Sequence, residues 1–552
     1  MKARTLIFSL TAAMLLASCN ATVTINSGSA PASSNTPAGS SAAPASSQED
    51  PASQGSQASE ASQASQASQT SQASQASQAS QTSEASQPVE SSQASQGGGA
   101  EYKAANVMDH PVEITFMSNF SYQGTLDKII GEFKKVEPNI TVTNVKETGG
   151  YDDVRNKVVS QLATNEHPDM FVGYPDSVEV VMEYDKVVRL DDYMNNEVYG
   201  WTEDDFEDII YSYLEEGQLY PMEGTYSLPF AKSTEALYYN ADVLIGLDLS
   251  GIDPTINGGA ALSEEYINNL TWEELFDHLI PAIQAKDESL PAEEKLLQGS
   301  KYDHTVFGYD SDDNLFITLA EQYGYGYTSI DEYGEGSLDF NNDDMKGLMK
   351  TFRKAYQSGG FITKGTNKNE YTNYRFTDNC ALFTVGSTGG TKYQISPDFV
   401  TGVARIPHAE GKDPKVISQG PSLAILDHDD EDRALASWLF YRFLTNKVNA
   451  ATWSIETGYA PVRYSVLEDG DYMKNISVEG VEPHSEDYIK AKAAEYVGII
   501  APEFFGSPVF KGSATARVEV GGLLSNCLLA EDLDGTIDSL FKTAIDNTLQ
   551  KM

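Results

Sequence analysis

From residue 112 onward, apolar and polar side chains follow first the period of a strand and then that of a helix. In "VEITFMSNF", Ile114 and Phe116 alternate with polar neighbours, which predicts a strand that ends in a Ser/Asn loop. "TLDKIIGEFKKVEPN" has apolar residues at helical spacing, so we expect a helix with Thr125 as N-cap and Pro138 as stop. "ITVTNV" predicts a second strand, and "YDDVRNKVVSQLATNEHPDMFVG" predicts a helix followed by a third strand. This order predicts a mostly parallel sheet covered by helices.

Helical and strand patterns continue to alternate through the rest of the chain. "LTWEELFDHL" begins with a capping box from Thr271 to Glu274, and "DDMKGLMKTFRKAY" is an amphipathic helix. "CALFTVG", "GVARIP" and "SLAIL" predict strands. "RALASWLFYRFLTNKVNAATWSIETG" predicts two helices, the second ending at Gly458, and "GTIDSLFKTAIDNTL" predicts a closing helix. The predicted fold class is α/β.

The N-terminal residues differ from this pattern and predict an export signal. "MKARTLIFSLTAAMLLASCN" has a basic start and an apolar stretch shorter than the roughly 20 residues that span a bilayer, which indicates a signal peptide over 1–18. Its end, Leu16-Ala17-Ser18-Cys19, resembles the lipobox of bacterial lipoproteins, which implies cleavage before Cys19 and lipidation of that residue. The alternative is an ordinary secretory cleavage beside an incidental cysteine.

Residues 19–99 are built largely from Ser, Gln and Ala in a repeating triplet. Such a segment cannot bury enough apolar surface to offset its chain entropy, so we predict a disordered tether. As a flexible coil of about 80 residues it would span on the order of 50 Å. A glycosylated or binding stalk is the alternative.

The body, residues 100–552, belongs to a chain of formal net charge −44, which argues against nucleic acid and anionic membrane as partners. Apart from Cys19, the chain contains Cys380 and Cys527, too few for a disulfide framework, although one bridge between them stays open. The histidines are scattered, with no HExxH motif and no Cys/His spacing, so the sequence predicts neither a metal site nor a cofactor.

The motifs "PDMFVG", "LPFAKSTEALYYN", "LTWEELFDHL", "FTDNCALFTVGSTGG", "GVARIPHAEG", "ISQGPSLAIL" and "ETGYAPVR" occur in this order. In this order they resemble the extracellular solute-binding proteins of ABC importers, in the carbohydrate branch, over nearly all of residues 110–552. The resemblance implies a two-lobed periplasmic-binding-protein-like (type II) fold with a ligand cleft between the lobes. The implied lobes are about 110–231 with 416–462, and about 236–415 with 463–552.

The segment "LPFAKSTEALYYN" has Lys, Ser, Thr and Glu at its centre, where a buried strand would favour Val or Ile. The resemblance makes it the first crossover between the lobes, so we expect this polar group to face a ligand. Within the carbohydrate branch, similarity to glycerol-phosphate receptors implies ligand contacts at Ser233, Ser387, Gly420 and Tyr459, and a phosphate contact at Arg517.

Each of these positions also has a structural interpretation. Ser233 fits a satisfied hinge serine, and Arg517 fits a surface ion pair in an acidic protein. "GSTGG", with Ser387 and Thr388, can present backbone N–H groups to an anion, or form a plain turn after a strand. Arg517 can grip a phosphate with two hydrogen bonds. Trp453, about one turn before Tyr459, fits either the site or the core.

Two loops add further candidates. Asn119, Phe120 and Tyr122 follow the first strand, in a loop that often reaches the ligand in this family. Tyr174 and Asp176 follow the "PDMFVG" strand, and open α/β sheets bind ligands at the carboxyl ends of their strands. Exposed loop positions without a ligand are the alternative.

The stretch "FGYDSDDNLF" departs from the glycerol-phosphate group, which has a Trp near this place. A carboxylate such as Asp310 would disfavour a phosphate and accept hydrogen bonds from sugar hydroxyls. Asp310, Asp312, Asn314 and Glu321 have EF-hand-like offsets, but Leu315 occupies the position that requires Gly, which argues against calcium.

The leading hypothesis is a monomeric receptor, not an enzyme, lipid-anchored at the extracellular face of the bacterial cytoplasmic membrane. It would bind a sugar or polyol, or a phosphorylated polyol, and dock in its closed form on a membrane permease. One alternative is a tethered glycoside hydrolase that uses two of the many carboxylates. Another is an adhesin, which would tolerate loss of the cleft residues.

Overall fold

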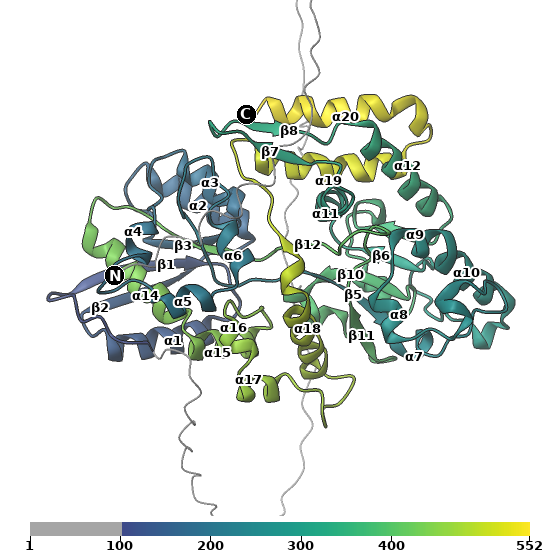
Figure 1. Cartoon of the computed structure of the whole chain (residues 1–552), viewed down its shortest axis with the longest axis horizontal. Coiled ribbons are helices and arrows are strands. Elements are labelled where there is room, and N and C mark those ends of the chain that lie inside the picture. The colour runs from purple at the N-terminus through teal and green to yellow at the C-terminus, as the bar shows by residue number, and fades with distance from the viewer. Residues whose placement is uncertain (1–101) are drawn as a thin grey trace, which may run out of the picture. The chain divides into compact units, whose positions relative to one another are not determined.

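The computed structural model describes residues 102–552 (Figure 1), and the predicted signal peptide, the lipidation at Cys19 and the tether lie outside them. All described residues fall within one compact unit of the chain. The first sheet has the strand order β2-β1-β3-β13-β4. Its strands are β1 (Val112–Ser118), β2 (Ile140–Lys146), β3 (Met170–Gly173), β4 (Leu228–Pro229) and β13 (Ser422–Ile425).

In this first sheet β1 pairs in parallel with β2 and β3, as the strand–helix–strand pattern predicts. β13 is far along the chain and pairs antiparallel with both β3 and β4. The helices belonging to this part of the chain are α1 (Gln123–Val136), α2 (Tyr151–Leu162), α3 (Pro175–Met182), α4 (Asp191–Met194), α5 (Glu203–Asp208), α6 (Tyr211–Glu216), α14 (Glu431–Leu444) and α15 (Lys447–Thr457). Apolar side chains on both faces of the sheet, including Phe116 and Phe171, are buried against them, and Phe133 of α1 belongs to the same core as Phe116.

The start of α1 differs from the prediction. The helix begins at Gln123 with Tyr122 as its N-cap residue, and Thr125 lies inside the first turn. The Thr125 hydroxyl donates to the Glu456 carboxylate at 2.6 Å instead of capping the helix, so a tertiary partner replaces the local one. The predicted end is confirmed, because α1 finishes at Val136, before Pro138.

The second sheet has the order β11-β5-β10-β6-β9. Its strands are β5 (Glu235–Asn240), β6 (Phe307–Tyr309), β9 (Phe361–Thr363), β10 (Phe383–Ser387) and β11 (Thr401–Ala404). β10, β6 and β9 are parallel, whereas β5 runs antiparallel to β10 and β11. An aromatic core that includes Trp272, Phe307 and Phe361 is buried against this sheet.

Helices of several lengths surround the second sheet. They are α7 (Ala241–Leu244), α8 (Glu264–Asn268), α9 (Trp272–Glu274), α10 (Ile280–Ser289), α11 (Asp312–Tyr323), α12 (Asp343–Gln357), α13 (Asn373–Thr377), α18 (Glu486–Ile500), α19 (Ser513–Leu529) and α20 (Leu533–Leu549), with the 3-10 helix η5 (Thr388–Gln394) after β10. Helix α19 packs against α11, α12 and α20 (Figure 1). Two short helices, α16 (Tyr464–Leu467) and α17 (Gly470–Asn475), follow α15.

The capping box predicted at Thr271 is half formed. The Thr271 hydroxyl accepts the Glu274 N–H at 3.1 Å, but the Glu274 carboxylate accepts the Tyr266 hydroxyl at 2.5 Å and does not return to the cap. The predicted helix end at Gly458 is confirmed, because that glycine has φ +82°, which favours glycine. Cys380 and Cys527 are both free and buried, so no bridge joins them.

Three segments that connect elements of the two sheets lie side by side. The first joins β4 to β5, the second includes β12 (Val416–Ile417) and leads to β13, and the third follows α15. Ser233 and Gln419 exchange backbone hydrogen bonds at 2.9 and 2.8 Å, and the Ala460 N–H donates to the Lys232 carbonyl at 2.7 Å. β12 also pairs in parallel with β14 (Phe504–Phe505), and β7 (Thr328–Ile330) forms a hairpin with β8 (Gly336–Leu338). Within residues 102–552, no helix is long and apolar enough to cross a membrane.

Candidate functional site

The polar centre of the first connecting segment is mostly satisfied by the protein itself. Lys232 is fully buried, and its ammonium donates to the Glu216 carboxylate, to the Gly420 carbonyl at 3.1 Å and to the Ser422 hydroxyl at 3.4 Å. The Thr234 hydroxyl donates to the Ile417 carbonyl at 2.8 Å. The expectation that this whole polar group faces a ligand is therefore wrong for Lys232 and Thr234.

Glu235 is the third buried member of this group. Its carboxyl accepts the Tyr309 hydroxyl and, at 3.2 Å, the Asn314 side-chain amide. Burial raises the pKa of Glu235 to about 8, and the two hydrogen bonds oppose that rise only in part. Glu235 is thus largely protonated at neutral pH and bonded inside the second sheet. It does not face a ligand, so the expectation is wrong here as well.

Ser233, in contrast, meets residues from two other parts of the chain. The Ser387 hydroxyl, at the end of β10, lies 3.4 Å from the Ser233 hydroxyl and donates to it. A Cβ placed on Gly389 would lie 3.2 Å from Cε1 of Tyr459 and 3.7 Å from Cβ of Ser233. The structure therefore brings together Ser233, Ser387 and Tyr459, with the Gly389 backbone close to the tyrosine ring.

Thr388 and Gly420 fix the segments that carry this group. The Thr388 hydroxyl accepts the Thr234 N–H at 3.1 Å, and the Thr388 N–H donates to the Thr234 carbonyl at 2.8 Å. Gly420 has φ +83°, and a Cβ there would lie 2.1 Å from the Ala231 carbonyl oxygen. Only glycine fits such a close approach of two backbones. Both residues are buried and hold the first connecting segment in place.

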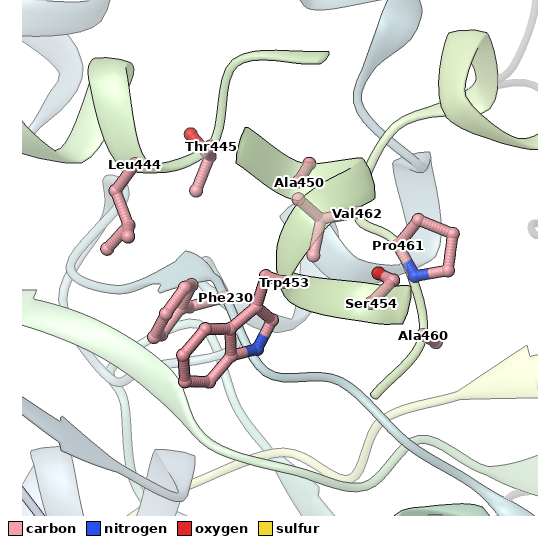
Figure 2. Close-up of a pocket in the computed structure, with 9 residues that line it drawn as sticks. All are labelled: Phe230, Leu444, Thr445, Ala450, Trp453, Ser454, Ala460, Pro461 and Val462. Carbon is pink, nitrogen blue, oxygen red and sulfur yellow. The ribbon is translucent and has the colours of Figure 1, made fainter. Parts of the chain in front are cut away.

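Aromatic rings support Tyr459 from behind. The Trp453 ring is stacked on Tyr459, with centroids 6.4 Å apart and planes 12° apart, and the Phe120 ring packs edge-on against both. Trp453 is 1 % exposed and Phe120 is 4 % exposed. Figure 2 shows Trp453 beside Phe230 in an apolar recess next to α15, where their ring centroids are 4.8 Å apart. Trp453 and Phe120 therefore position the tyrosine from within the core.

A chain of tyrosines extends the group toward the first sheet. The Tyr459 hydroxyl lies 3.1 Å from the Tyr151 hydroxyl, and the Tyr151 ring packs edge-on against Tyr174 at 5.1 Å. Tyr174 is the N-cap residue of α3, and Asp176 lies in its first turn. Asn119 lies in the neighbouring loop, where its amide donates to the Gly149 carbonyl at 3.3 Å. Tyr151 was not predicted, because its position after "ETGG" marks only a helix start.

Arg517 lies among carboxylates from two different sides. On α19, its guanidinium donates to Asn314 Oδ1 at 2.6 Å and to Asp313 Oδ2 at 3.2 Å, both on α11. Its Nε is 3.9 Å from Asp176 Oδ2, on α3. Burial opposes the charge, but Asp313 and Asp176 outweigh burial and raise the pKa of Arg517. The cation is thus shared between elements of both sheets.

Asp310 directly follows β6 and is bonded to Thr372, the N-cap residue of α13. Its carboxylate accepts the Thr372 N–H and, at 2.8 Å, the Thr372 hydroxyl. Burial raises the pKa of Asp310 to about 6, against these hydrogen bonds. The Asp312 carboxylate accepts from Thr363 and Ser525. Within the described part of the chain, no cluster of His, Cys, Asp and Glu side chains could hold a metal ion.

A small recess lies where elements of the two sheets meet. It leaves no room for a water molecule, so it is far smaller than the roughly 300–1,000 Å³ of ligand pockets. Sequence reasoning predicted two of its lining residues, Tyr122 and Thr388, and missed the two lysines. The full lining is Tyr122, Thr388, Gly389, Thr391, Lys392, Thr457, Gly458 and Lys490. The elements of the two sheets are therefore closed against each other at this recess. Hydroxyls, tyrosine rings and two ammonium groups lie where they meet.

The family model described as "Bacterial extracellular solute-binding protein" matches residues 128–479. Among characterised relatives, the sn-glycerol-3-phosphate-binding periplasmic protein UgpB of Salmonella typhimurium is 23 % identical over 363 residues, covering 63 % of this chain and 74 % of that protein. UgpB of Escherichia coli strain K12 is 26 % identical over 262 residues, covering 45 % of this chain and 52 % of that protein.

Solved structures share the fold. UgpB from Mycobacterium tuberculosis in complex with glycerophosphocholine has a TM-score of 0.59 at 20 % identity, covering 80 % of this chain and 98 % of that one. The sugar-binding protein MalE from Xanthomonas citri has a TM-score of 0.60 at 14 % identity, covering 80 % and 98 %. These likenesses confirm the predicted two-lobed α/β fold class.

Proposed function

Because the chain belongs to the bacterial extracellular solute-binding proteins, we propose that it captures a sugar or polyol outside the cell and delivers it to an ABC permease. The relatives and structural neighbours described above are binding proteins by name. That likeness supports a role in binding rather than catalysis. The tethered-hydrolase hypothesis has no comparable support.

The observation that carries this proposal is the meeting of Ser233, Ser387 and Tyr459 at the connecting segments. A polyol needs fixed hydrogen-bond donors and acceptors together with an aromatic face for its C–H surface. The two hydroxyls and the tyrosine ring supply both. They come from different segments, so a movement of one sheet relative to the other would open and close the site.

Opening is needed because the recess is smaller than a sugar site. Ligand must bind the closed arrangement more tightly than the open one, since only that difference can drive closure. Tyr122, Tyr174 and Asp176 would reach the ligand from the first sheet, and Thr388 and Asp310 from the second. Phe120, Trp453, Asn119 and Gly420 would shape the site from behind.

A phosphorylated polyol is the second candidate ligand. The names of the relatives include glycerol 3-phosphate, and one solved neighbour holds glycerophosphocholine. If the ligand is a phosphorylated polyol, Arg517 would contact its phosphate. The phosphate would then have to displace the carboxylates of Asp313 and Asp176 from the guanidinium.

The anchor is proposed from the sequence alone. Cleavage before Cys19 and lipidation of that residue would tether a monomer to the outer face of the cytoplasmic membrane. Cys19→Ala should release the protein from the membrane fraction into the medium. Retention of this variant on the membrane would contradict lipid anchoring at Cys19.

Thermal unfolding of the full chain against mono- and oligosaccharides, polyols and glycerol 3-phosphate tests the proposal. A ligand at a hundred times its dissociation constant should add about 2.7 kcal/mol to the native state. A shift with one small class of ligands supports a receptor, and prolonged incubation should leave an oligosaccharide intact. Appearance of hydrolysis products would favour the enzyme, and no shift with any member would contradict the proposed ligand class.

A further inference from the structure

The recess beside Gly389 is lined by two ammonium groups and by no carboxylate. Lys392 on η5 and Lys490 on α18 contribute the charges. The remaining lining consists of Tyr122, two glycines and three threonines, which are uncharged at neutral pH. The full chain carries a formal net charge of −44, so the positive charge of this lining is opposite in sign to the charge of the protein as a whole.

Lys392 has no acidic side chain within ion-pair distance among residues 102–552. Its ammonium lies 5.6 Å from the centroid of the Tyr122 ring and 5.2 Å from that of Tyr393. The negative faces of these rings hold the charge without neutralising it. Burial opposes the charge, but Tyr122, Tyr393 and, from beyond ion-pair distance, the Glu486 carboxylate raise the pKa of Lys392, so this side chain stays cationic at neutral pH.

Lys490 is only partly committed elsewhere. Its ammonium pairs with Glu486, one turn earlier on α18, at 2.6 Å. Both side chains of that pair are partly exposed, and such a surface pair contributes little free energy. An anion in the recess can therefore pair with Lys392 directly. It can also pair with Lys490 by displacing the Glu486 carboxylate, which is only weakly bound.

The recess is continuous with the proposed ligand group. Gly389 lines it, and the same residue approaches Tyr459 and Ser233. Tyr122 comes from the start of α1 and Lys392 from η5, so the contact between them joins elements of the two sheets. A group bound here would touch both sheets while the rest of its ligand lay against Tyr459.

We propose that this recess, once a movement of the two sheets has opened it, holds an anionic group, a carboxylate or a phosphate, of a ligand whose hydroxylated part lies against Tyr459. The inference rests on the proposed function and narrows it to acidic sugars or polyols. Lysine suits this role as a compact point charge that imposes little geometry on the anion. In this arrangement Arg517 remains bound to its carboxylates, and the anion binds at Lys392.

Isothermal titration of the full chain with matched probes tests this inference. Glucuronate, glucose 6-phosphate and glycerol 3-phosphate are the anionic probes, and glucose and glycerol are the neutral ones. We expect at least one anionic probe to bind tenfold or more tighter than its neutral counterpart, about 1.4 kcal/mol. Preference for glucuronate or for a phosphate ester distinguishes the two kinds of anion. The preference should weaken with added salt.

Variants separate the recess from the rest of the site. Lys392→Gln should remove the preference for the anion, and Lys392→Arg should keep most of it. Lys301→Gln is the matched control, because Lys301 also lies over a tyrosine ring, at 5.0 Å, but pairs with Asp378. This control should leave affinity unchanged.

Two results would overturn the inference while leaving the proposed function intact. One is tight binding of a neutral probe with no gain from an added anionic group. The other is an anion preference that survives in Lys392→Gln and is lost in Arg517→Met. If none of the probes binds, both the inference and the proposed ligand class are contradicted.

Discussion

Arg517 and Lys392 are both cations near the contact between the two sheets, and their surroundings differ. Arg517 is within 4 Å of Asp313, Asn314 and Asp176, from helices on both sides. Lys392 lies near two tyrosine rings and, among residues 102–552, has no carboxylate within ion-pair distance, although Glu486 acts on it from farther away. A charge that already has partners stabilises one arrangement of the protein, whereas an unpaired charge can attract a ligand.

This difference extends to the neighbouring side chains. On the Arg517 side, Asn314 also donates to the buried carboxyl of Glu235, and Lys232 of the first connecting segment binds Glu216 at the end of α6. On the Lys392 side, Ser387 and Tyr459 stay partly exposed. We therefore expect changes near Arg517 to affect stability and changes near Lys392 to affect affinity.

The largest expected effect is on stability, from Lys232→Met. Removing the lysine leaves Glu216 buried without its cation, which should lower the free energy of unfolding by about 3–5 kcal/mol in urea titrations. The double variant Lys232→Met with Glu216→Leu should recover most of the loss, because it removes both charges. A single variant as stable as the wild type would show that this pair does not support the connecting segment.

Tyr459→Ala should weaken ligand binding about 100-fold, or ~2.7 kcal/mol, because a centrally placed tyrosine commonly dominates a binding site. Titration with whichever probe binds the wild type measures this loss. Tyr333→Ala is the matched control, since Tyr333 is 80 % exposed in the turn between β7 and β8. Equal affinity of Tyr459→Ala and wild type would place the ligand elsewhere.

Arg517→Met should have a smaller effect, and mainly on stability. Its ion pairs are partly exposed, so we expect the free energy of unfolding to fall by about 1 kcal/mol at low salt. Affinity for an anionic probe should change less than tenfold, because the anion binds at Lys392. A loss of affinity greater than tenfold in this variant would indicate that Arg517, and not Lys392, binds the anion.

Glu235→Gln should change how stability depends on pH. Burial raises the pKa of Glu235 to about 8 in the folded protein, above its ordinary value near 4.5. The folded state therefore holds a proton that the unfolded state releases, and this stabilisation is full below pH 4.5 and is lost as pH rises through 8. Urea titrations should show that the free energy of unfolding falls less between pH 5 and pH 8 for Glu235→Gln than for wild type.

Local patterns predicted most of the strands and helices, because their spacing depends on near neighbours. Gly458 ends α15 as predicted, since a left-handed residue after a helix favours glycine. Thr125 shows the limit of this reasoning, because its hydroxyl binds Glu456, which is 331 residues away. The polar centre of the first connecting segment could not be assigned either, since Lys232 is paired by Glu216 and Gly420 from other elements.

The candidate site was partly predictable from the family resemblance. The similarity to glycerol-phosphate receptors implied Ser233, Ser387 and Tyr459, and the structure brings them together. Tyr151 and Lys392 have no local pattern that marks them, and their positions depend on how the two sheets meet. The Tyr151–Tyr459 contact joins residues 308 apart in the chain, which periodicity cannot reveal.

The most direct test of a ligand site between the two sheets is hydrogen–deuterium exchange of the full chain with and without the probe that gives the largest thermal shift. We predict simultaneous protection of peptides that contain Tyr122, Ser233, Ser387 and Tyr459, which come from different segments. The hairpin of β7 and β8 should exchange equally in both states. Protection confined to one sheet, or located away from these four residues, would contradict the account.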